Sequence, residues 1–588
     1  MMHCFRCDIL ERFRQRFTRL YGTEAADRLL ERLKLLLCRY QEETAEFNLP
    51  DVLWDEHDVV LITYGDMVRQ SFEAPLKTLH RFLNEHLREA VNTVHILPFF
   101  PYSSDWGFSI IDYRQVDPEL GTWEDVDGLA RDYYLMFDLV LNHVSRRSTW
   151  FHDYVAGVLP ACDFFIHVRP GTDLSDVVRP RSKPLLSATH TRAGTQHVWT
   201  TFSDDQIDLN FANPDVLFEF LDLLLLYIER GARIIRLDAI AYLWKKIGTS
   251  CIHLPETHEV VKLMRDLVDF VASNALILTE TNVPHRENIS YFGDQDEAHV
   301  IYQFSLPPLL LHALLTGNAT HLRDWAGTVS CAPPGCTYLN FTASHDGIGV
   351  RPLEGVVPPD ELDALCEHTR KRGGQVSTKT NSDGSESPYE LNITYFDALV
   401  DPDNEDEDLQ VAKFLCSQSV MLVLKGIPAV YFNSLFGGRN DLRGVEETGE
   451  PRAINRAKWD GVQLGERLAT EGSPEQTVFA RYVARLACRR NSAAFHPDGR
   501  QEVPDLGESV FAVKRTSPDG EQAMLCLHNL TPETAEVTVD RQMPRDVTIG
   551  DLTDAVTGEP CRIDGAAVRL APFEALWLQV PAETAARP

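Results

Sequence analysis

Three acidic side chains each follow a short apolar run, and together they form a candidate catalytic set. They are Asp238, Glu280 and Asp346. Taken singly, such residues more often cap a helix, face solvent or mark a turn. Their joint position at the ends of three predicted strands instead favours one shared pocket. One carboxylate as nucleophile and a second, of raised pKa, as acid/base is the arrangement that retaining glycosyl transfer requires.

Eight short apolar runs that alternate with amphipathic helical stretches would position these carboxylates. The runs are VVLITYG (59–65), TVHILPFF (93–100), YLMFDLVLN (134–142), ARIIRLDAI (232–240), ALILTE (275–280), HVIYQF (299–304), TYLNFTAS (337–344) and IPAVYF (427–432). This alternation predicts an α/β fold, a (β/α)8 TIM barrel. Active sites of such barrels are built at the C-terminal ends of the strands.

The regions outside the barrel pattern predict additional domains. We expect a helical N-terminal extension (1–50), a first barrel part (51–143), an inserted small domain B after strand 3 (144–212), the rest of the barrel (213–500) and a C-terminal all-β, sandwich-like domain (501–588). A long loop or subdomain after strand 7 spans 351–408. Long excursions in a compact domain are usually functional.

Composition narrows the classes of function and partner. Of the 588 residues, 44% are hydrophobic and 24% charged, which excludes wholesale disorder. A net charge of -31 argues against nucleic acid and anionic membranes as partners. No run has the length of a signal peptide or a membrane span, and twelve scattered cysteines suit a reducing compartment, so we expect a cytoplasmic protein. The N-terminal helices are expected to pack on the barrel or on a second subunit, which leaves a homodimer open.

Several motifs carry a family resemblance across residues 55 to 460. FDLVLNH (137–143), IIRLDAIAY (234–242), ILTETN (277–282) and NFTASHDGIGV (340–350) resemble the four ordered motifs of the alpha-amylase superfamily, glycoside hydrolase family 13. QIDLN (206–210), which begins with Gln206, resembles the additional motif of its inserted domain. LITYGD, HILPFFPYSSDWGFSIIDY and SHDGIGVRPLEG are similar to the sucrose phosphorylase branch of that superfamily.

The resemblance implies a role for each candidate residue. Asp238 would be the nucleophile, Glu280 the general acid/base and Asp346 the stabiliser of the oxocarbenium-like transition state. Arg236 would keep Asp238 ionised by charge pairing. The expected glucose-binding residues are His143, His345, Asp105, Arg452, Gln206, Phe108 and Phe202, and for the two phenylalanines plain core packing is the alternative.

Phosphate and the acceptor would meet two long loops. Arg181, in Arg179-Pro180-Arg181, resembles the phosphate-binding arginine of the branch, and its guanidinium suits bidentate contact, with a solvated loop arginine as the alternative. Tyr389 matches a tyrosine that reaches phosphate or acceptor. The resemblance implies no metal and no cofactor, with inorganic phosphate as co-substrate.

The acceptor loop departs from sucrose phosphorylases. Ser387 and Glu390 replace the pair that grips fructose there, and Glu390 is a candidate substrate contact. The loop and the N-terminal extension most resemble glucosylglycerate phosphorylases. A basic run (370–372), followed by Lys379, would suit an acceptor with a carboxylate. The implied partners are a small glucoside and phosphate, in the reaction 2-O-α-D-glucosylglycerate + phosphate ⇌ α-D-glucose 1-phosphate + D-glycerate by double displacement.

Other functions remain open at this point. Sucrose, sucrose 6-phosphate or glucosylglycerol could be the donor of a related phosphorylase. An α-glucosidase or transglucosidase would use the same carboxylates with water or a sugar as acceptor. A non-catalytic sugar-binding barrel is a further class, and the intact Asp238, Glu280 and Asp346 argue against it.

Overall fold

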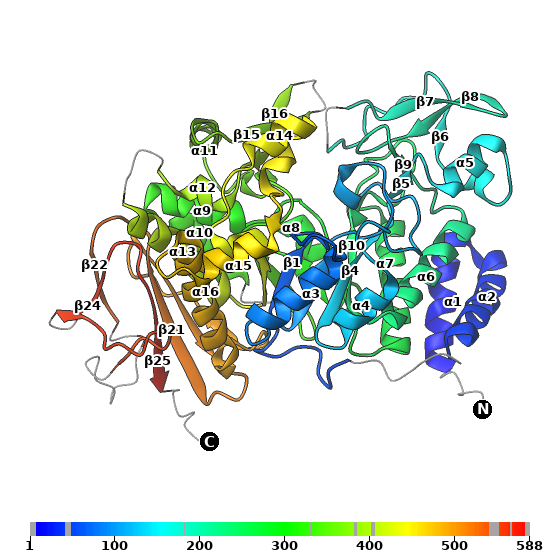
Figure 1. The fold of residues 1–588 in the computed structure, drawn as a ribbon. Helices are drawn as coiled ribbons and strands as arrows, with labels where there is room; N and C mark the ends of the chain where they lie inside the picture. Colours follow the sequence, from blue (N-terminus) through cyan, green and yellow to red (C-terminus); the bar gives the residue numbers. More distant parts are fainter. Residues whose placement is uncertain are drawn as a thin grey trace.

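The computed structural model of the chain has a closed parallel barrel at its centre (Figure 1). The structure describes residues 7–41, 49–180, 183–329, 332–381, 385–401, 406–539, 542, 552–564 and 567–581. The barrel strands, in chain order, are β1 (Val60–Thr63), β3 (Thr93–Ile96), β4 (Tyr134–Val140), β10 (Ala232–Asp238), β11 (Leu276–Thr279), β12 (Val300–Tyr302), β13 (Thr337–Phe341) and β17 (Ile427–Tyr431). Each neighbours the next and β17 closes onto β1, so the predicted (β/α)8 barrel is confirmed.

Helices surround the barrel and cover its strands. They include α3 (Pro75–His86), α4 (Trp123–Ala130), α6 (Pro214–Glu229), α7 (Pro255–Val271), α9 (Leu306–Thr316), α10 (Thr320–Val329), α13 (Glu407–Val423) and α16 (Pro474–Arg490). Asn213 caps α6 by accepting from the backbone N–H of Asp215, with Pro214 at the first helical position. Most of α6 is buried, because it is covered on its outer side as well.

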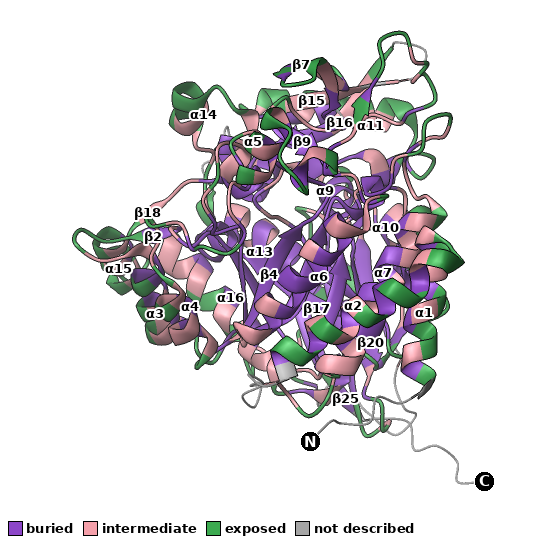
Figure 2. Cartoon of the chain, turned by 90° about the vertical axis from the view of Figure 1, so that its right-hand side faces the viewer, coloured by how far each residue is buried: buried purple, intermediate pink, exposed green. Residues whose placement is uncertain are grey.

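That outer cover is a helical hairpin of α1 (Cys7–Tyr21) and α2 (Thr23–Gln41) (Figure 2). Phe13 and Phe17 are fully buried, and the ring of Phe17 stacks on Phe218 of α6 at 5.9 Å. Arg16 forms ion pairs with Asp266 of α7 at 3.1 Å. The N-terminal helices therefore pack on the barrel of their own chain, the first of the two expected arrangements.

Two excursions lie over the C-terminal ends of the strands. The first follows β4 and contains β5 (His143–Ser145), α5 (Thr149–Ala156), β6 (His167–Val168), β7 (Leu186–Thr191), β8 (Gly194–Trp199) and β9 (Gln206–Asp208). The second follows β13 and contains β14 (Ile348–Gly349), α11 (Pro359–Lys371), β15 (Gln375–Thr380), β16 (Glu386–Asn392) and α12 (Tyr395–Leu399). Both therefore supply residues to the barrel mouth.

The C-terminal region is all-β and packs beside α13 and α16. One sheet has the order β19 (Arg500–Glu502), β20 (Val510–Thr516), β21 (Gln522–Asn529) and β25 (Ala575–Pro581). A smaller sheet has β22 (Ala535–Thr538), β24 (Ala567–Leu570) and β23 (Ile563–Asp564). Within the described ranges, no helix is both long and apolar enough to cross a membrane.

Candidate active site

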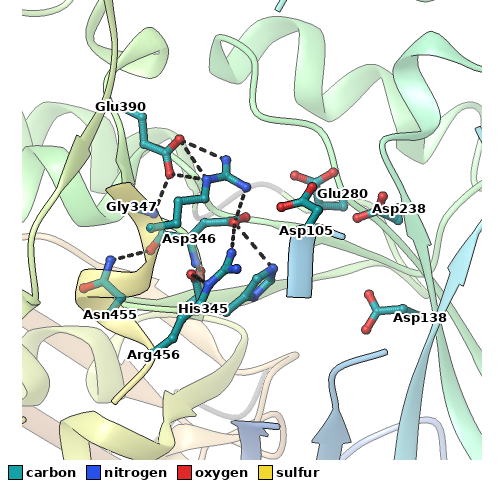
Figure 3. Close-up of polar contacts among 12 residues, drawn as sticks. Asp105, Asp138, Asp238, Glu280, His345, Asp346, Gly347, Glu390, Asn455 and Arg456 are labelled. Atoms are coloured by element: carbon teal, nitrogen blue, oxygen red, sulfur yellow. Dashed lines mark hydrogen bonds and ion pairs between the residues drawn. The ribbon is translucent and has the colours of Figure 1, made fainter. Parts of the chain in front are cut away.

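The three candidate carboxylates meet at the mouth of the barrel (Figure 3). Asp238 is the last residue of β10, Glu280 directly follows β11, and Asp346 lies in the turn after β13. All three line one inner pocket of about 70 Å³. The pocket is also lined by Asp105, Phe108, His143, Phe202, Gln206, His345, Tyr389 and Arg452. The barrel thus brings together residues that are up to 347 positions apart, from Asp105 to Arg452.

Asp238 sits in a buried network of alternating charges. The Nη1 of Arg236 lies 2.6 Å from Asp238 Oδ1 and 2.5 Å from Oδ1 of Asp138 on β4. His95 on β3 contacts the other oxygen of Asp138 at 2.7 Å. Burial raises the pKa of Asp238, and the guanidinium of Arg236 opposes that shift. Arg236 thereby favours an ionised Asp238, the form a nucleophile needs.

Glu280 lies in a less cationic environment than its neighbours. Its Oε2 accepts a hydrogen bond from the backbone N–H of Ala239 at 2.9 Å. Burial raises the pKa of Glu280 to about 7; Arg236 opposes the shift, and the negative charges of Asp238 and Asp346 add to it. A carboxyl group with this pKa carries a proton part of the time at neutral pH, as a general acid/base must.

Asp346 is held by cations. Burial opposes its ionisation, but Arg452, His345 and Arg456 together hold the pKa of Asp346 well below its usual range. Arg452 Nη1 lies 2.6 Å from Asp346 Oδ1, and Arg456 Nη2 lies 3.7 Å from the same oxygen. Arg456 Nε also donates to the carbonyl of His345 at 2.9 Å. Asp346 is therefore a fixed negative charge beside the other two carboxylates.

Glu390 of β16 completes this group from the second excursion. It accepts from Arg452 Nη2 at 2.9 Å and from Arg452 Nε at 3.1 Å, and its Oε1 also accepts from the backbone N–H of Gly347. Glu390 is only 4% exposed. Its carboxylate thus orients Arg452 and the turn that carries Asp346, a contact that the sequence did not predict.

The opposite wall of the inner pocket comes from the first excursion and the loop after β3. Gln206 Nε2 donates to Asp105 Oδ2 at 3.1 Å, and His143 Nε2 lies 3.0 Å from the carbonyl of Phe108. Burial lowers the pKa of His143, which favours the neutral ring. The ring of Phe108 stacks on His345 at 4.9 Å and 7°. Polar groups and aromatic rings therefore both line the pocket.

An outer pocket of about 710 Å³ opens from the inner one. The two share Asp105, Gln206, Tyr389 and Arg452. The outer pocket is further lined by Tyr102, Ser104, Trp106, Pro180, Lys183, 203–205, 376–378, Glu390, Glu450, Pro451 and Arg456. Both excursions thus form its walls. Arg181, the predicted phosphate contact, lies outside the described residues.

Comparison with known proteins places this geometry in a family. Residues 87–325 match the family described as alpha amylase, catalytic domain, and residues 509–578 match the D-apionate lactonase, C-terminal immunoglobulin-like domain. The chain is 48% identical to the glucosylglycerate phosphorylase of Spirochaeta thermophila, over 97% of this chain and 98% of that one. It is 43% identical to the glucosylglycerate phosphorylase of Escherichia coli K12, over 90% of this chain and 92% of that one.

The chain belongs to the glycoside phosphorylases of the alpha-amylase superfamily. A solved structure with the same architecture is that of sucrose 6F-phosphate phosphorylase from Thermoanaerobacter thermosaccharolyticum. Its TM-score is 0.70, at 27% identity, over 81% of this chain and 94% of that one. The immunoglobulin-like match agrees with the all-β C-terminal sheets.

The basic run of the acceptor loop does not line either pocket of this glycoside phosphorylase. Lys379 pairs with Glu354 at 2.8 Å, while Arg370 and Lys371 both lie within 4 Å of Glu367. These side chains are held by local carboxylates instead of facing the barrel mouth. Lys183, which the sequence did not point to, lines the outer pocket together with Arg452 and Arg456.

Sequence reasoning predicted the pairing of Arg236 with Asp238 but missed its second partner, Asp138. Asp138 lies inside the recognised motif FDLVLNH, and it is directly opposite Arg236 in the register of β4 and β10. The predicted barrel order alone would have placed these residues side by side. His95, which holds Asp138, lies inside the predicted strand 93–100.

Asn142 is likewise held by a residue that the sequence did not suggest. Lys245 Nζ lies 2.6 Å from Asn142 Oδ1 and 2.6 Å from Asp208 Oδ2. Lys245 is itself buried, so its ammonium ties the first excursion to the loop after β10.

Proposed function

We propose that this chain is a retaining phosphorylase that interconverts 2-O-α-D-glucosylglycerate and phosphate with α-D-glucose 1-phosphate and D-glycerate. The supporting observation is the difference in identity between relatives. The two glucosylglycerate phosphorylases share 48% and 43% of their residues with this chain, and the sucrose 6F-phosphate phosphorylase shares 27%. The carboxyl groups of Asp238 and Glu280 supply the nucleophile and the acid/base of the proposed reaction.

In the first step, Asp238 Oδ attacks the anomeric carbon of the glucosyl group and the bond from that carbon to the glycerate oxygen breaks. Glu280 gives its proton to the departing oxygen, so this oxygen leaves as the neutral 2-hydroxyl group of D-glycerate, whose carboxylate keeps its charge. Asp346 stabilises the positive charge that develops on the ring, because it remains ionised beside Arg452.

In the second step, a phosphate oxygen attacks the anomeric carbon and the ester bond to Asp238 breaks. Glu280, now ionised, accepts the proton of the incoming phosphate and is ready for the next turnover. Two inversions give retention of configuration. We assign Arg181 and Tyr389 as phosphate contacts.

Recognition of glycerate requires a partner for its carboxylate, and we assign Lys183. Of the residues that the structure describes, three cations line the outer pocket: Lys183, Arg452 and Arg456. Arg452 is already paired with Asp346 and Glu390, and Arg456 donates to a backbone carbonyl. Lys183 is exposed at the opposite wall, where its ammonium can meet an acceptor that enters from solvent.

The reaction as proposed needs no organic cofactor and no metal, because carboxylates perform the proton transfer and the covalent step. Its partners are small molecules. Nucleic acid and membranes are not expected, given the net charge of -31, and the cysteine usage favours the cytoplasm. A homodimer stays a prediction, to be checked by light scattering.

The test is phosphate release from α-D-glucose 1-phosphate with D-glycerate, fructose, fructose 6-phosphate, glycerol or no acceptor in parallel. Fast release with D-glycerate alone supports the proposal. Preference for fructose or its phosphate would identify a sucrose or sucrose 6-phosphate phosphorylase. Equal release without an acceptor would identify a hydrolase.

A further inference from the structure

A second cavity lies at the seam between the barrel and the C-terminal domain. Its volume is about 260 Å³. Ala412 and Leu415 of α13 and two residues of α16 form one side, and residues between 554 and 576 form the other. No residue that lines this cavity also lines the inner or the outer pocket of the active site. It is therefore a separate space.

Among the described residues, four arginines line this seam cavity: Arg481, Arg485, Arg562 and Arg569. Arg481 and Arg485 are four residues apart on α16, so both point from the same face of the helix. Like charges at this spacing repel each other. Such a cluster is unexpected in a chain with 87 acidic and 56 basic residues.

The carboxylates of the cavity are largely engaged by other groups. Asp554 accepts from the backbone N–H of Trp577 at 2.9 Å and from the hydroxyl of Thr557 at 2.8 Å. Glu574 accepts from the backbone N–H of Ala571 at 2.7 Å and pairs with Arg562 at 3.0 Å. The third carboxylate, Glu559, is exposed at the rim. Only Arg562 thus has a carboxylate partner among these contacts.

Among the cavity arginines that form no ion pair with a carboxylate of the described residues, Arg485 is the least exposed. Its Nη1 donates to the backbone carbonyl of Arg481 at 3.0 Å, and its Nε is buried with no hydrogen-bond partner among the described residues. Burial lowers the pKa of Arg485, and the charge of Asp554 only partly opposes that shift. Burying an N–H donor of a charged guanidinium without a hydrogen-bond partner costs free energy of folding. An anion bound to Arg485 would offset that cost.

We propose that the seam cavity binds a phosphate group, carried by inorganic phosphate or by a small phosphorylated metabolite. Guanidinium groups bind phosphate oxygens in pairs, and Arg481, Arg485 and Arg569 are placed around one space. Ala412, Leu415 and Phe573 offer an apolar wall for a carbon skeleton. The ligand would bridge α16 and the C-terminal domain.

A ligand that bridges two parts of the fold stabilises the folded state by mass action. The test measures the melting temperature of the full-length protein with inorganic phosphate, glucose 6-phosphate or 3-phosphoglycerate. It compares the wild type with Arg485→Gln and with the double variant Arg481→Gln/Arg485→Gln. Arg500→Gln is the matched control, because Arg500 is exposed, pairs with Glu502 and does not line the cavity.

We expect at least one probe to raise the wild-type Tm by about 2 °C or more at saturating concentration. The shift should be preserved in Arg500→Gln and lost or halved in both cavity variants; phosphate bound at the active site would account for a residual shift. A larger shift with a sugar phosphate than with inorganic phosphate would identify a metabolite as the ligand. The reverse order would identify phosphate itself.

Direct location of the anion separates this cavity from the active site. Crystals grown without sulfate or phosphate and soaked in sodium tungstate should show an anomalous peak between Arg485 and Arg569. That peak should be absent from Arg485→Gln crystals, where any peak at the active site remains. Equal thermal shifts in all variants, or tungstate only at the active site, would overturn the proposal.

Discussion

Replacing Glu280 with glutamine separates its role as a proton donor from its role in the shape of the pocket. The amide oxygen of glutamine can still accept the hydrogen bond from Ala239 N–H, which Glu280 accepts at 2.9 Å. The volume of the side chain hardly changes. What is lost is the proton that we propose is given to the departing glycerate oxygen.

The expected loss follows from the environment of Glu280. General acid catalysis contributes about 10²–10⁴-fold, so phosphorolysis of glucosylglycerate should fall by about that factor in Glu280→Gln. Because burial raises the pKa of Glu280 to about 7, the wild type should lose activity as the pH rises through neutrality. Between pH 7 and pH 8 the protonated fraction falls roughly fivefold, and kcat/KM for the glucoside should fall with it.

The assay compares two donors that differ only in the leaving group. Fluoride leaves α-glucosyl fluoride without a proton, whereas glycerate needs one. Glu280→Gln should therefore retain far more activity on the fluoride than on glucosylglycerate, and its rate on the glucoside should no longer fall between pH 7 and pH 8. A nearby exposed glutamate, in Glu287→Gln, is the control. Equal losses on both donors would refute the assignment, since they would indicate disrupted binding or folding.

Three further changes test other parts of the structure. Lys183→Gln should raise KM for D-glycerate about tenfold with little change in KM for glucose 1-phosphate. The control variant Lys379→Gln should leave both KM values unchanged. Identical kinetics of the two variants would show that Lys183 does not bind the acceptor. Arg236→Met removes the cation that pairs with the buried carboxylates of Asp238 and Asp138, and Asp138 keeps its contact with His95. It should destabilise the fold by about 3–5 kcal/mol in urea denaturation, so an unchanged midpoint would contradict the buried network. Phe17→Ala should cost about 3–5 kcal/mol if the hairpin unfolds with the barrel, and a separate early transition would show instead that it unfolds alone.

The barrel could be read from the sequence because its strands are buried on both faces. Such strands appear as continuous apolar runs, and each predicted run contains or overlaps an observed strand. The run 232–240, for example, became β10 (Ala232–Asp238), with Asp238 at its C-terminal end. Once the strands are ordered, the convergence of the three carboxylates follows from the geometry of the barrel.

The ion-pair partners of the site residues could not be predicted from the sequence in this way. Arg452, which follows β17, and Glu390, which lies in the second excursion, are 62 residues apart, so no local sequence pattern predicts their ion pair. The basic run near Lys379 was interpreted from charge alone, and local carboxylates engage it. Lys183 can be recognised as a pocket residue only in the folded structure, where both excursions form the walls of the outer pocket.

The same edge of the barrel gives two neighbouring carboxyl groups opposite properties. Asp346 has Arg452 at 2.6 Å and Arg456 at 3.7 Å, so its negative charge is compensated and its pKa is low. Glu280 accepts one backbone N–H, and burial, with the added effect of two anionic neighbours and against the opposing charge of Arg236, raises its pKa to about 7. The ion pair between Arg452 and Glu390 contributes to this difference, because it fixes Arg452 beside Asp346. Glu390, which contacts Asp346 only through Arg452 and the neighbouring Gly347, thus helps to decide which carboxyl group carries the proton.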